Sequence, residues 1–580
     1  YICLQRILRR KTKKFGNMTY KVISCLFVVA LLLLTVQITP LLWPQQLVWL
    51  EFVAIVGCLV MAISSLFLRT NCQLTVVDIL VTVWWWYVFL CAYFKTGYPC
   101  SYEMTVYSVL YGLYVLLRFL FSVFPLRDGI FEHLFMFAAF LEVGLGIWQL
   151  GVGKSLHPLF PVTGSFYNPG PYAAYVAIGM SVALVQLAEL RKEARYYYYR
   201  KVAYLLLLVF GTFVLLIAGS RGALLSLFVV VFWKYGRLIR RYLGYLIVVG
   251  FSLGTVLLYA KFGSVMGRLV IWYLSGKLIA ENCLFGAGIG SFKGEYGQAL
   301  FHFFSQSSQA DYFAHYVDVT DYAFCDLLQV GVEQGLIGIS LCLTLIVLAI
   351  HTMSRNTHGL FAALLALLVF SLFSYPFQLL PFQILGVVLL AKIPMVPVRC
   401  LCLTWRKHLC LSLVLVMLGW QGIGFARTHV KARLASLDAT LSIHAAYIND
   451  CYPLLEYCSE DKAFLFNFAK MLQADGRYVD SNFVLMQGTK VSNDPMFWVL
   501  MGNNLKAMRL YDEAVACYDR ASGMLPNRVY PIYQKMKLNL ETGRICQAKR
   551  CAHHLLARKP KVESSATKQM YDEACAVLKH

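Results

Sequence analysis

The sequence carries little charge for its length. Only 14% of its 580 residues are Asp, Glu, Lys or Arg, whereas 59% are hydrophobic. Soluble domains have roughly 25% charged residues. The composition therefore excludes an ordinary soluble globular protein and predicts a polytopic membrane protein.

Acidic residues are especially scarce, with 30 Asp and Glu against 52 Lys and Arg, which gives a net charge of +22. The basic residues gather in four clusters that are dispersed between apolar stretches. This dispersal favours a topology signal over nucleic-acid binding, because all four clusters fall on one side if the spans alternate. That side is the cytoplasm by the positive-inside rule. The clusters lie at 9–14, 191–201, 234–241 and 399–407.

Metal-ligand spacing is also missing. Many of the 18 cysteines lie within apolar stretches, where they behave as small apolar residues. Six of the 18 lie in the tail, and an oxidising exterior would permit disulfides among them. No spacing resembles a metal site, so we expect neither a metal nor another cofactor. The tail cysteines are Cys451, Cys458, Cys517, Cys546, Cys551 and Cys575.

Long apolar stretches dominate the chain up to residue 426. There are about thirteen, mostly of 17 to 22 residues, and a helix of that length crosses a hydrocarbon core of roughly 30 Å. The predicted fold is therefore an all-α bundle of 12–13 transmembrane helices. The stretches are 20–38, 47–68, 74–95, 103–124, 130–150, 171–190, 202–219, 222–236, 243–260, 334–350, 358–374, 379–397 and 409–426.

The predicted topology puts the basic N-terminus, residues 1–19, inside. Three segments then lie outside: 151–170, the long loop 261–333, and the tail 427–580. Arg221 sits at the outer end of a span, where a charge costs several kcal/mol unless something polar receives it. Arg268 is a second arginine, at the start of the long loop. We expect the two to meet at the outer face.

The tail has the period of a tetratricopeptide array. A shift of 34 residues maps Ala514 onto Ala548 and Pro526 onto Pro560, and a looser copy precedes these around Ala469. Stacked helix pairs of this kind bury a face that each pair alone cannot. We therefore predict about three repeats, with an unrelated helical bundle as the alternative. The best-matching positions are Trp498, Met501, Gly502, Leu505, Ala514, Tyr518, Ala521 and Pro526.

Five motifs occur in a recognisable order over residues 150–400. Together they resemble the O-antigen ligase and polymerase superfamily, multi-span glycan transferases of the bacterial inner membrane that act on its periplasmic face. The resemblance implies that the outer segments are periplasmic. The motifs are Thr163–Pro169, Gly219–Leu225, Arg268 with Trp272, Leu284–Phe292 and Glu333–Gly338.

The resemblance also implies a site. Donors in this superfamily are glycans on undecaprenyl diphosphate, and arginine suits a diphosphate because its planar fork donates two parallel hydrogen bonds. We predict Arg221 and Arg268 as the clamp on this group, with snorkelling or ordinary interfacial placement as the alternatives. Asn168 and Glu333 have a structural alternative, because residues of these types also stabilise the ends of helices. For Gly288 and Gly290 the alternative is a tight turn. The predicted substrate-binding residues are Ser220, Trp272, Gly288, Gly290, Asn168 and Glu333.

The general base is not fixed by the motifs. Many ligases of the superfamily place a His-Asn pair nine residues before the motif glutamate, but here that register falls on Phe324 and Cys325. His315 is the candidate we put in its place. The same loop offers three others, His302, Asp321 and Asp326, and the remaining alternative is a reaction without a strong base.

The predicted activity is metal-independent transfer of a preassembled glycan from undecaprenyl diphosphate to an acceptor. Lipid A-core, as in O-antigen ligases, ranks first. A growing polysaccharide, as in polymerases, and a protein serine or threonine are the alternatives. Expected partners are the bilayer and a protein bound by the tail, but no nucleic acid. Two alternatives are not transferases. One is a lipid-linked glycan transporter, which would bury charges along several spans, and the other is an inactive scaffold.

Overall fold

In the computed structural model, nine of the predicted spans correspond to helices. The predicted N-terminus and the spans at 20–38, 47–68, 243–260 and 409–426 lie outside the described residues, as does most of 427–447. Apart from a few single positions, the structure describes residues 70–95, 97–98, 101–123, 128–239, 262–306, 310–394, 398–403, 448–456, 458–558 and 563–579.

Apart from α13, which begins before its predicted span, the nine helices agree with the predicted spans. Among the described residues, α3 to α7 and α13 are long and apolar enough to cross a membrane, as judged by length and composition. The bounds are α3 Val76–Phe94, α4 Ser101–Val123, α5 Asp128–Val152, α6 Pro169–Glu189, α7 Tyr197–Ala218, α8 Arg221–Ile239, α13 Asp326–Asn356, α14 His358–Ser371 and α15 Leu380–Ala391. A helical fold is thus confirmed, while the membrane itself stays a prediction.

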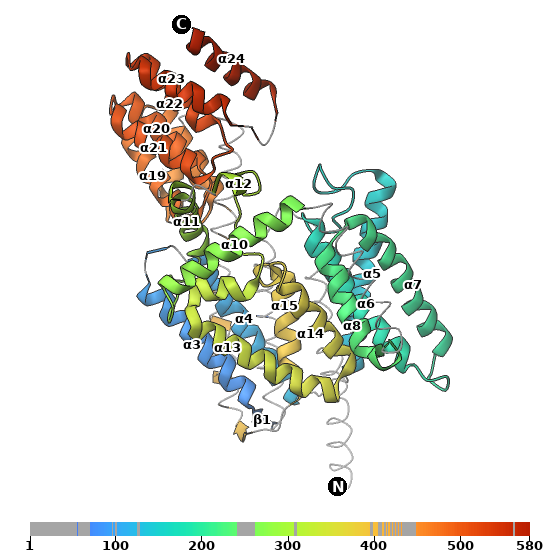
Figure 1. The fold of residues 1–580 in the computed structure, drawn as a ribbon. Coiled ribbons are helices and arrows are strands. Elements are labelled where there is room, and N and C mark those ends of the chain that lie inside the picture. Colours follow the sequence, from blue (N-terminus) through green and yellow to red (C-terminus); the bar gives the residue numbers. More distant parts are fainter. Residues whose placement is uncertain are drawn as a thin grey trace, which may run out of the picture.

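Helix α6 is the centre of one group of helices. It packs against α5, α7, α8 and α14 (Figure 1). Small residues allow this close approach: a Cβ on Gly179 would come within 2.1 Å of the Ala139 Cβ on α5. Consequently α6 is the most deeply buried of the long apolar helices among the described residues.

A second group contains α3, α4, α13 and α15, and it encloses an ion pair that the sequence did not predict. Arg118 of α4 donates to Asp78 of α3 at 2.7 Å. Thr75 and Tyr114 donate to the same carboxylate, each at 2.7 Å. A buried charge is stable only when it is paired and hydrogen-bonded in this way.

Helix α13 is interrupted at Gly335, whose backbone (φ 66°, ψ −165°) is not helical. The segment 283–288 docks at this break. Ala287 N–H donates to the Val332 carbonyl at 2.8 Å and Gly288 N–H to the Glu333 carbonyl at 3.1 Å. A Cβ on Gly335 would lie 2.4 Å from the Leu284 carbonyl oxygen, so only glycine allows this contact.

The position predicted for Glu333 is therefore corrected. The sequence placed it at the start of a span, but α13 begins at Asp326, so Glu333 lies just before the break rather than at a helix N-terminus. Hydropathy alone missed the part of α13 that precedes the break at Gly335, because several of its residues are polar. The polar residues are Asp326, Gln329, Glu333 and Gln334.

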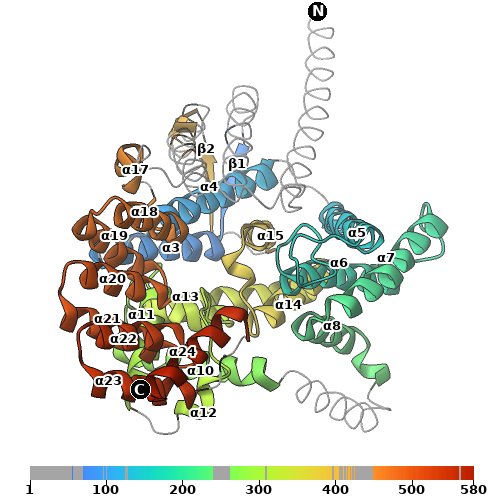
Figure 2. The ribbon, with the colours of Figure 1, turned by 90° about the horizontal axis from the view of Figure 1, so that it is seen from above.

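The predicted long loop is largely helical. It contains α10 (Phe262–Glu281), α11 (Phe292–Gln306) and α12 (Ala310–Ala314). These helices lie between the helix bundle and the tail (Figure 1). Seen from above, the tail covers the side of α10 and α13 rather than that of α5 to α8 (Figure 2). The loop therefore forms a layer on which the tail rests.

One short ribbon departs from the predicted all-α fold. Strand β1 (Thr70–Leu74) pairs antiparallel with β2 (Arg399–Leu403), with Thr70 opposite Leu403. The ribbon lies at the end of the bundle opposite the tail (Figure 1). Both strands fall in segments that the alternating topology assigns to the inner side. Their pairing spans more than 300 residues of sequence, so no local pattern predicted it.

The tail forms a helical repeat, as predicted. After α17 (Ile448–Leu455), the first helices of three successive pairs begin 34 residues apart, at Lys462, Met496 and Tyr530. Close packing fixes the second pair: a Cβ on Gly502 would lie 2.6 Å from the Tyr518 ring. The pairs are α18 (Lys462–Ala474) with α19 (Tyr478–Val491), α20 (Met496–Ala507) with α21 (Tyr511–Met524), and α22 (Tyr530–Glu541) with α23 (Ile545–Leu556), followed by α24 (Ser565–Lys579).

The turn inside each pair needs one residue in the left-handed region. Gly476 (φ 80°) and Gly543 (φ 72°) fill this position in the first and third pairs, whereas Arg509 (φ 63°) fills it in the second. A residue with a Cβ pays roughly 1–2 kcal/mol for this conformation. The second pair therefore carries strain that its neighbours avoid.

We expect Arg509→Gly to stabilise the second pair by about 1 kcal/mol. Hydrogen exchange of the α20 and α21 amides in the full-length protein would slow about fivefold, because local opening becomes less favourable. Gly543→Ala is the matched control and should speed exchange in α22 and α23. Faster exchange in Arg509→Gly would contradict the assignment of strain.

Candidate functional site

The turn between α7 and α8 places Arg221. Gly219 ends α7 in the left-handed conformation (φ 62°), and its N–H donates to the Leu215 carbonyl. The Ser220 hydroxyl accepts from Ala223 N–H at 3.5 Å, so Ser220 caps α8. Gly222 lies against α14, and a Cβ on Gly222 would be 3.2 Å from the Phe370 ring. Each residue around Arg221 thus has a structural reason for its identity.

Arg268 connects α10 to the end of α14. Its Nη1 donates to the Phe373 carbonyl at 2.9 Å, and its guanidinium lies over the Phe324 ring, 5.0 Å from the centroid. A desolvated cation–π contact contributes up to about 2 kcal/mol. The side chain is therefore held on two sides.

Arg221 and Arg268 are close enough to interact. Burial lowers the pKa of Arg268, and the positive charge of Arg221 lowers it further. Arginine remains charged even so, because its ordinary pKa lies above 12. Two cations brought together repel each other, and a bound anion would offset that repulsion.

An aromatic cluster, defined here as Tyr322, Phe324 and Tyr375, lies beside Arg268. The Tyr322 and Tyr375 rings stack at 4.1 Å, and Phe324 meets Tyr375 edge-on at 5.4 Å. Burial and the Asp321 charge raise the pKa of Tyr322 to about 12, so its hydroxyl stays protonated. Phe324 is left-handed (φ 53°), a strained conformation of the kind that gathers at functional sites.

Asn168 joins the loop before α6 to this cluster. Its Oδ1 accepts from Gly170 N–H at 2.9 Å. Asn168 therefore caps α6, which is the structural alternative that the sequence offered for this residue. Its Nδ2 donates to the Tyr375 hydroxyl at 2.9 Å. The amide therefore contacts the cluster in addition to capping a helix.

Glu142 of α5 supports the loop that carries Asn168. Its carboxylate accepts from Ser165 N–H at 3.0 Å and also from the Ser165 hydroxyl. Gln149 of α5 adds a second support by accepting from Thr163 N–H at 2.9 Å. Both side chains are buried, so they fix the loop rather than contact a ligand.

Trp272 belongs to α10, and the glycine-rich segment follows that helix in the chain. Trp272 is one turn after Arg268, and its ring centre is 6.3 Å from that of Phe373. Its buried Nε1 has no hydrogen-bond partner among the described residues. Gly288 (φ 114°), at the end of the segment docked on α13, and Gly290 (φ 73°), just after it, have left-handed backbones. Their turn geometry accounts for both glycines without a ligand.

The candidate bases differ in their surroundings. His315 and His302 are exposed and contact the neighbouring rings of Tyr316 and Phe301. Asp321 pairs with Lys462 of the tail at 2.6 Å. Asp326 is buried two residues after Phe324.

Asp326 has an unusual environment among these four. Its Oδ2 accepts from Phe377 N–H at 3.3 Å, while its Oδ1 is buried without a hydrogen-bond partner among the described residues. A buried acceptor left unpaired costs about 1–3 kcal/mol. Phe377 belongs to the same connection between α14 and α15 as Tyr375, which links Asp326 to the aromatic cluster.

The tail holds the segment that leads into the aromatic cluster. Asn493, which is completely buried, accepts from Thr320 N–H at 3.1 Å and donates to the Thr320 carbonyl and, at 3.4 Å, to the Lys293 carbonyl. One amide thus joins the repeats to α11 and to residues just before Tyr322.

The sequence did not predict Tyr375, Tyr322 or Glu142. A signal existed for Tyr375: it opens the short connection between the spans predicted at 358–374 and 379–397, and alternation puts that connection on the outer side with Arg221. Glu142 was a carboxylate within a predicted span, which by itself suggests a specific partner. Tyr322 carried no comparable signal.

Among the described residues, no group of three or more His, Cys, Asp or Glu side chains is placed to hold a metal ion. No protein-family model matches the chain, and no curated protein matches it. Solved structures with some likeness include the crystal structure of the APC/C hetero-tetramer Cut9-Hcn1. It is 12% identical, covers 92% of this chain and 90% of that chain, and has a TM-score of 0.19. A score this low carries no argument about fold or function.

We expect Asn493→Ala to loosen the segment before the aromatic cluster. The change leaves the Thr320 backbone groups unpaired, at about 1–3 kcal/mol, so the amides of residues 320–324 should exchange about tenfold faster or more. Hydrogen exchange followed by mass spectrometry would measure this. Asn467→Ala, on α18, is the control. Unchanged exchange at 320–324 in Asn493→Ala would show that the tail does not hold this segment.

Proposed function

We propose that the chain is a polytopic protein of a bacterial inner membrane. Large apolar side chains remain exposed on the outward faces of the long helices: Val209 and Leu216 of α7 are each 64% exposed and Phe94 of α3 is 74% exposed. Apolar surface of this extent is not stable in water. A lipid bilayer would cover it.

Within that membrane, we propose that the protein transfers a preassembled glycan from undecaprenyl diphosphate to an acceptor on the periplasmic face. The observation that carries this proposal is the geometry of Arg268, whose guanidinium is held by the Phe373 carbonyl and the Phe324 ring within reach of the charge of Arg221. Of the five N–H donors of Arg268, the described residues accept from one, through the Phe373 carbonyl. The other donors and the second cation suit a diphosphate.

The reaction would be a displacement at the anomeric carbon. An acceptor hydroxyl oxygen forms a bond to that carbon, the bond to the diphosphate oxygen breaks, and the lipid diphosphate leaves with the electron pair. Arg221 and Arg268 would stabilise the negative charge that develops on this leaving group. The Trp272 Nε1–H, which has no described partner, would donate to an oxygen of the same substrate.

The proton of the acceptor hydroxyl needs a receiver. The Phe324 ring cannot accept a proton, although its position is the one where the superfamily usually has histidine. We propose Asp326 in preference to His315, because Asp326 is buried next to the aromatic cluster and its Oδ1 lacks a partner among the described residues. His315 is exposed.

The acceptor ranking follows the motif resemblance, with lipid A-core first and a growing polysaccharide or a protein hydroxyl as alternatives. A transporter of lipid-linked glycans is a second candidate, since Asp78 and Arg118 are a charged pair inside the helix bundle. That pair is satisfied by Thr75 and Tyr114, which is what a structural pair requires. We therefore rank transfer above transport.

Replacing either arginine of the pair should abolish most glycan transfer. In proteoliposomes supplied with undecaprenyl diphosphate-linked glycan and lipid A-core, we expect Arg221→Ala and Arg268→Ala each to lower the rate by about 10²–10³. Arg268→Lys should recover only part of it, because lysine keeps the charge but lacks the planar fork. Arg191→Ala is the matched control, because Arg191 follows the C-terminal end of α6 on the predicted cytoplasmic side. Wild-type rates in both alanine variants would exclude the clamp.

The base assignment can be tested separately. We expect Asp326→Asn to lower kcat by about 10²–10⁴ without a comparable rise in KM, because the amide cannot receive a proton. His315→Ala should leave kcat within about twofold. The reverse pattern would identify His315 as the base, and full activity in both variants would indicate a reaction without either group.

A further inference from the structure

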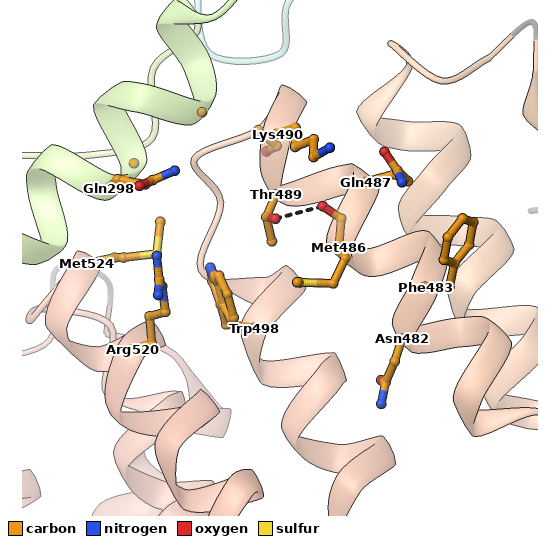
Figure 3. A pocket seen from close by; sticks show the side chains of 13 residues that line it. Gln298, Asn482, Phe483, Met486, Gln487, Thr489, Lys490, Trp498, Arg520 and Met524 are labelled. Carbon is orange, nitrogen blue, oxygen red and sulfur yellow. Dashed lines mark hydrogen bonds between the residues drawn. The ribbon is translucent and has the colours of Figure 1, made fainter. Parts of the chain in front are cut away.

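A cleft separates α11 from the helices of the tail. Its volume is about 630 Å³ and it is lined by α11, α19, α20 and α21 (Figure 3). Two glycines of α11 bring its walls together: a Cβ on Gly294 would lie 2.5 Å from the Lys490 carbonyl oxygen, and one on Gly297 3.1 Å from Asn493. The cleft is thus built into the junction between the long loop and the repeats.

Arg520 of α21 lies between two aromatic rings in this cleft. Its guanidinium carbon lies 4.3 Å from the Trp498 ring centroid and 5.3 Å from that of Phe301. Its Nε is buried and has no hydrogen-bond partner among the described residues. A buried donor without an acceptor is unfavourable, so an acceptor group bound in the cleft would remove this cost. Stacking between two rings also pre-organises the guanidinium for a planar anion.

The lining is basic and rich in side-chain amides. Lys490 and Arg520 contribute positive charge, and among the described residues neither Asp nor Glu lines the cleft. The amides of Gln298, Gln487 and Asn482 can each donate and accept hydrogen bonds, which suits the N–H and C=O groups of a peptide backbone. The cleft is therefore complementary in charge to an acidic chain.

An apolar stripe continues from the cleft along α19. Val479 is 67% exposed, Phe483 60% and Met486 51%, and their i, i+4, i+7 spacing puts them on one helix face. Phe483 and Met486 also line the cleft. Basic and apolar surfaces are therefore contiguous, and a ligand that fills both needs a carboxylate beside large apolar groups.

We propose that this cleft binds an acidic peptide segment of a partner protein. A carboxylate of the segment pairs with Arg520, assisted by Lys490, and an apolar side chain next to it packs on Phe483 and Met486. A glycan fits less well, because Arg520 already covers the Trp498 ring and Phe483 is the single aromatic residue of the stripe, beside Val479 and Met486. The site is separate from Arg221 and Arg268 and does not depend on the proposed transfer activity.

The test is selection of short random peptides displayed on phage, with the full-length protein in nanodiscs as bait and empty nanodiscs for subtraction. The expected result is enrichment of sequences in which Asp or Glu adjoins Leu, Phe or Met. The most enriched sequence, synthesised with a fluorescent label, then gives Kd values by anisotropy. We expect Arg520→Gln and Phe483→Ser each to weaken binding about tenfold or more, and binding to weaken as salt rises.

Lys470→Gln is the matched control, because it removes one positive charge from the exposed side of α18; its Kd should stay within about twofold. Lys490→Gln is a second test of the same cleft in case Arg520→Gln perturbs folding. It should weaken peptide binding while the amides of the repeats keep their protection from hydrogen exchange. The proposal is overturned if acidic sequences are not enriched, or if neither Arg520→Gln nor Lys490→Gln changes Kd. It is also overturned if an acidic oligosaccharide such as oligogalacturonate displaces the peptide and binds more tightly.

Discussion

The repulsion between Arg221 and Arg268 is the constraint on which the rest of the structure depends. The two guanidinium groups, one at the start of α8 and the other in the second turn of α10, lie within interaction range. Both burial and the neighbouring charge disfavour the protonated form of Arg268. The protein opposes this with the Phe373 carbonyl and the Phe324 ring. A site that concentrates positive charge in this way is suited to an anion of high charge density, such as a diphosphate.

Neighbouring elements fix the geometry around this pair through close backbone contacts. Gly219 and Gly222 shape the turn that carries Arg221, and Gly335 opens the break in α13 where the glycine-rich segment docks. Asn493 of the tail then holds the chain just before Tyr322. The tail is therefore part of the support for the aromatic cluster, in addition to carrying its own basic cleft. A displacement of the repeats would therefore move Thr320 and, through the chain, Phe324.

Local sequence predicted the parts of the molecule that depend on local chemistry. Span length and hydropathy located α3 to α8, α14 and α15, and the 34-residue period located the three helix pairs. What it missed depends on contacts between distant segments: the stack of Tyr322 on Tyr375, the support of Ser165 by Glu142, and the pairing of Asp78 with Arg118. No residue pattern within one helix encodes its partner on another. The motif order led to the prediction of Arg221 and Arg268 as site residues, which stays a prediction, but it gave no sign that Phe324 would lie under the guanidinium of Arg268.

The central claim is that the two arginines bind one diphosphate together. The most direct measurement is a double-mutant cycle on the Kd of undecaprenyl diphosphate, using the purified wild-type protein, Arg221→Ala, Arg268→Ala and the double variant, with undecaprenyl monophosphate as the comparison ligand. The account predicts that each single change weakens diphosphate binding by about tenfold or more, that the double variant is weakened by less than the product, and that the monophosphate is affected less. Equal affinity of all four proteins for the diphosphate would contradict it.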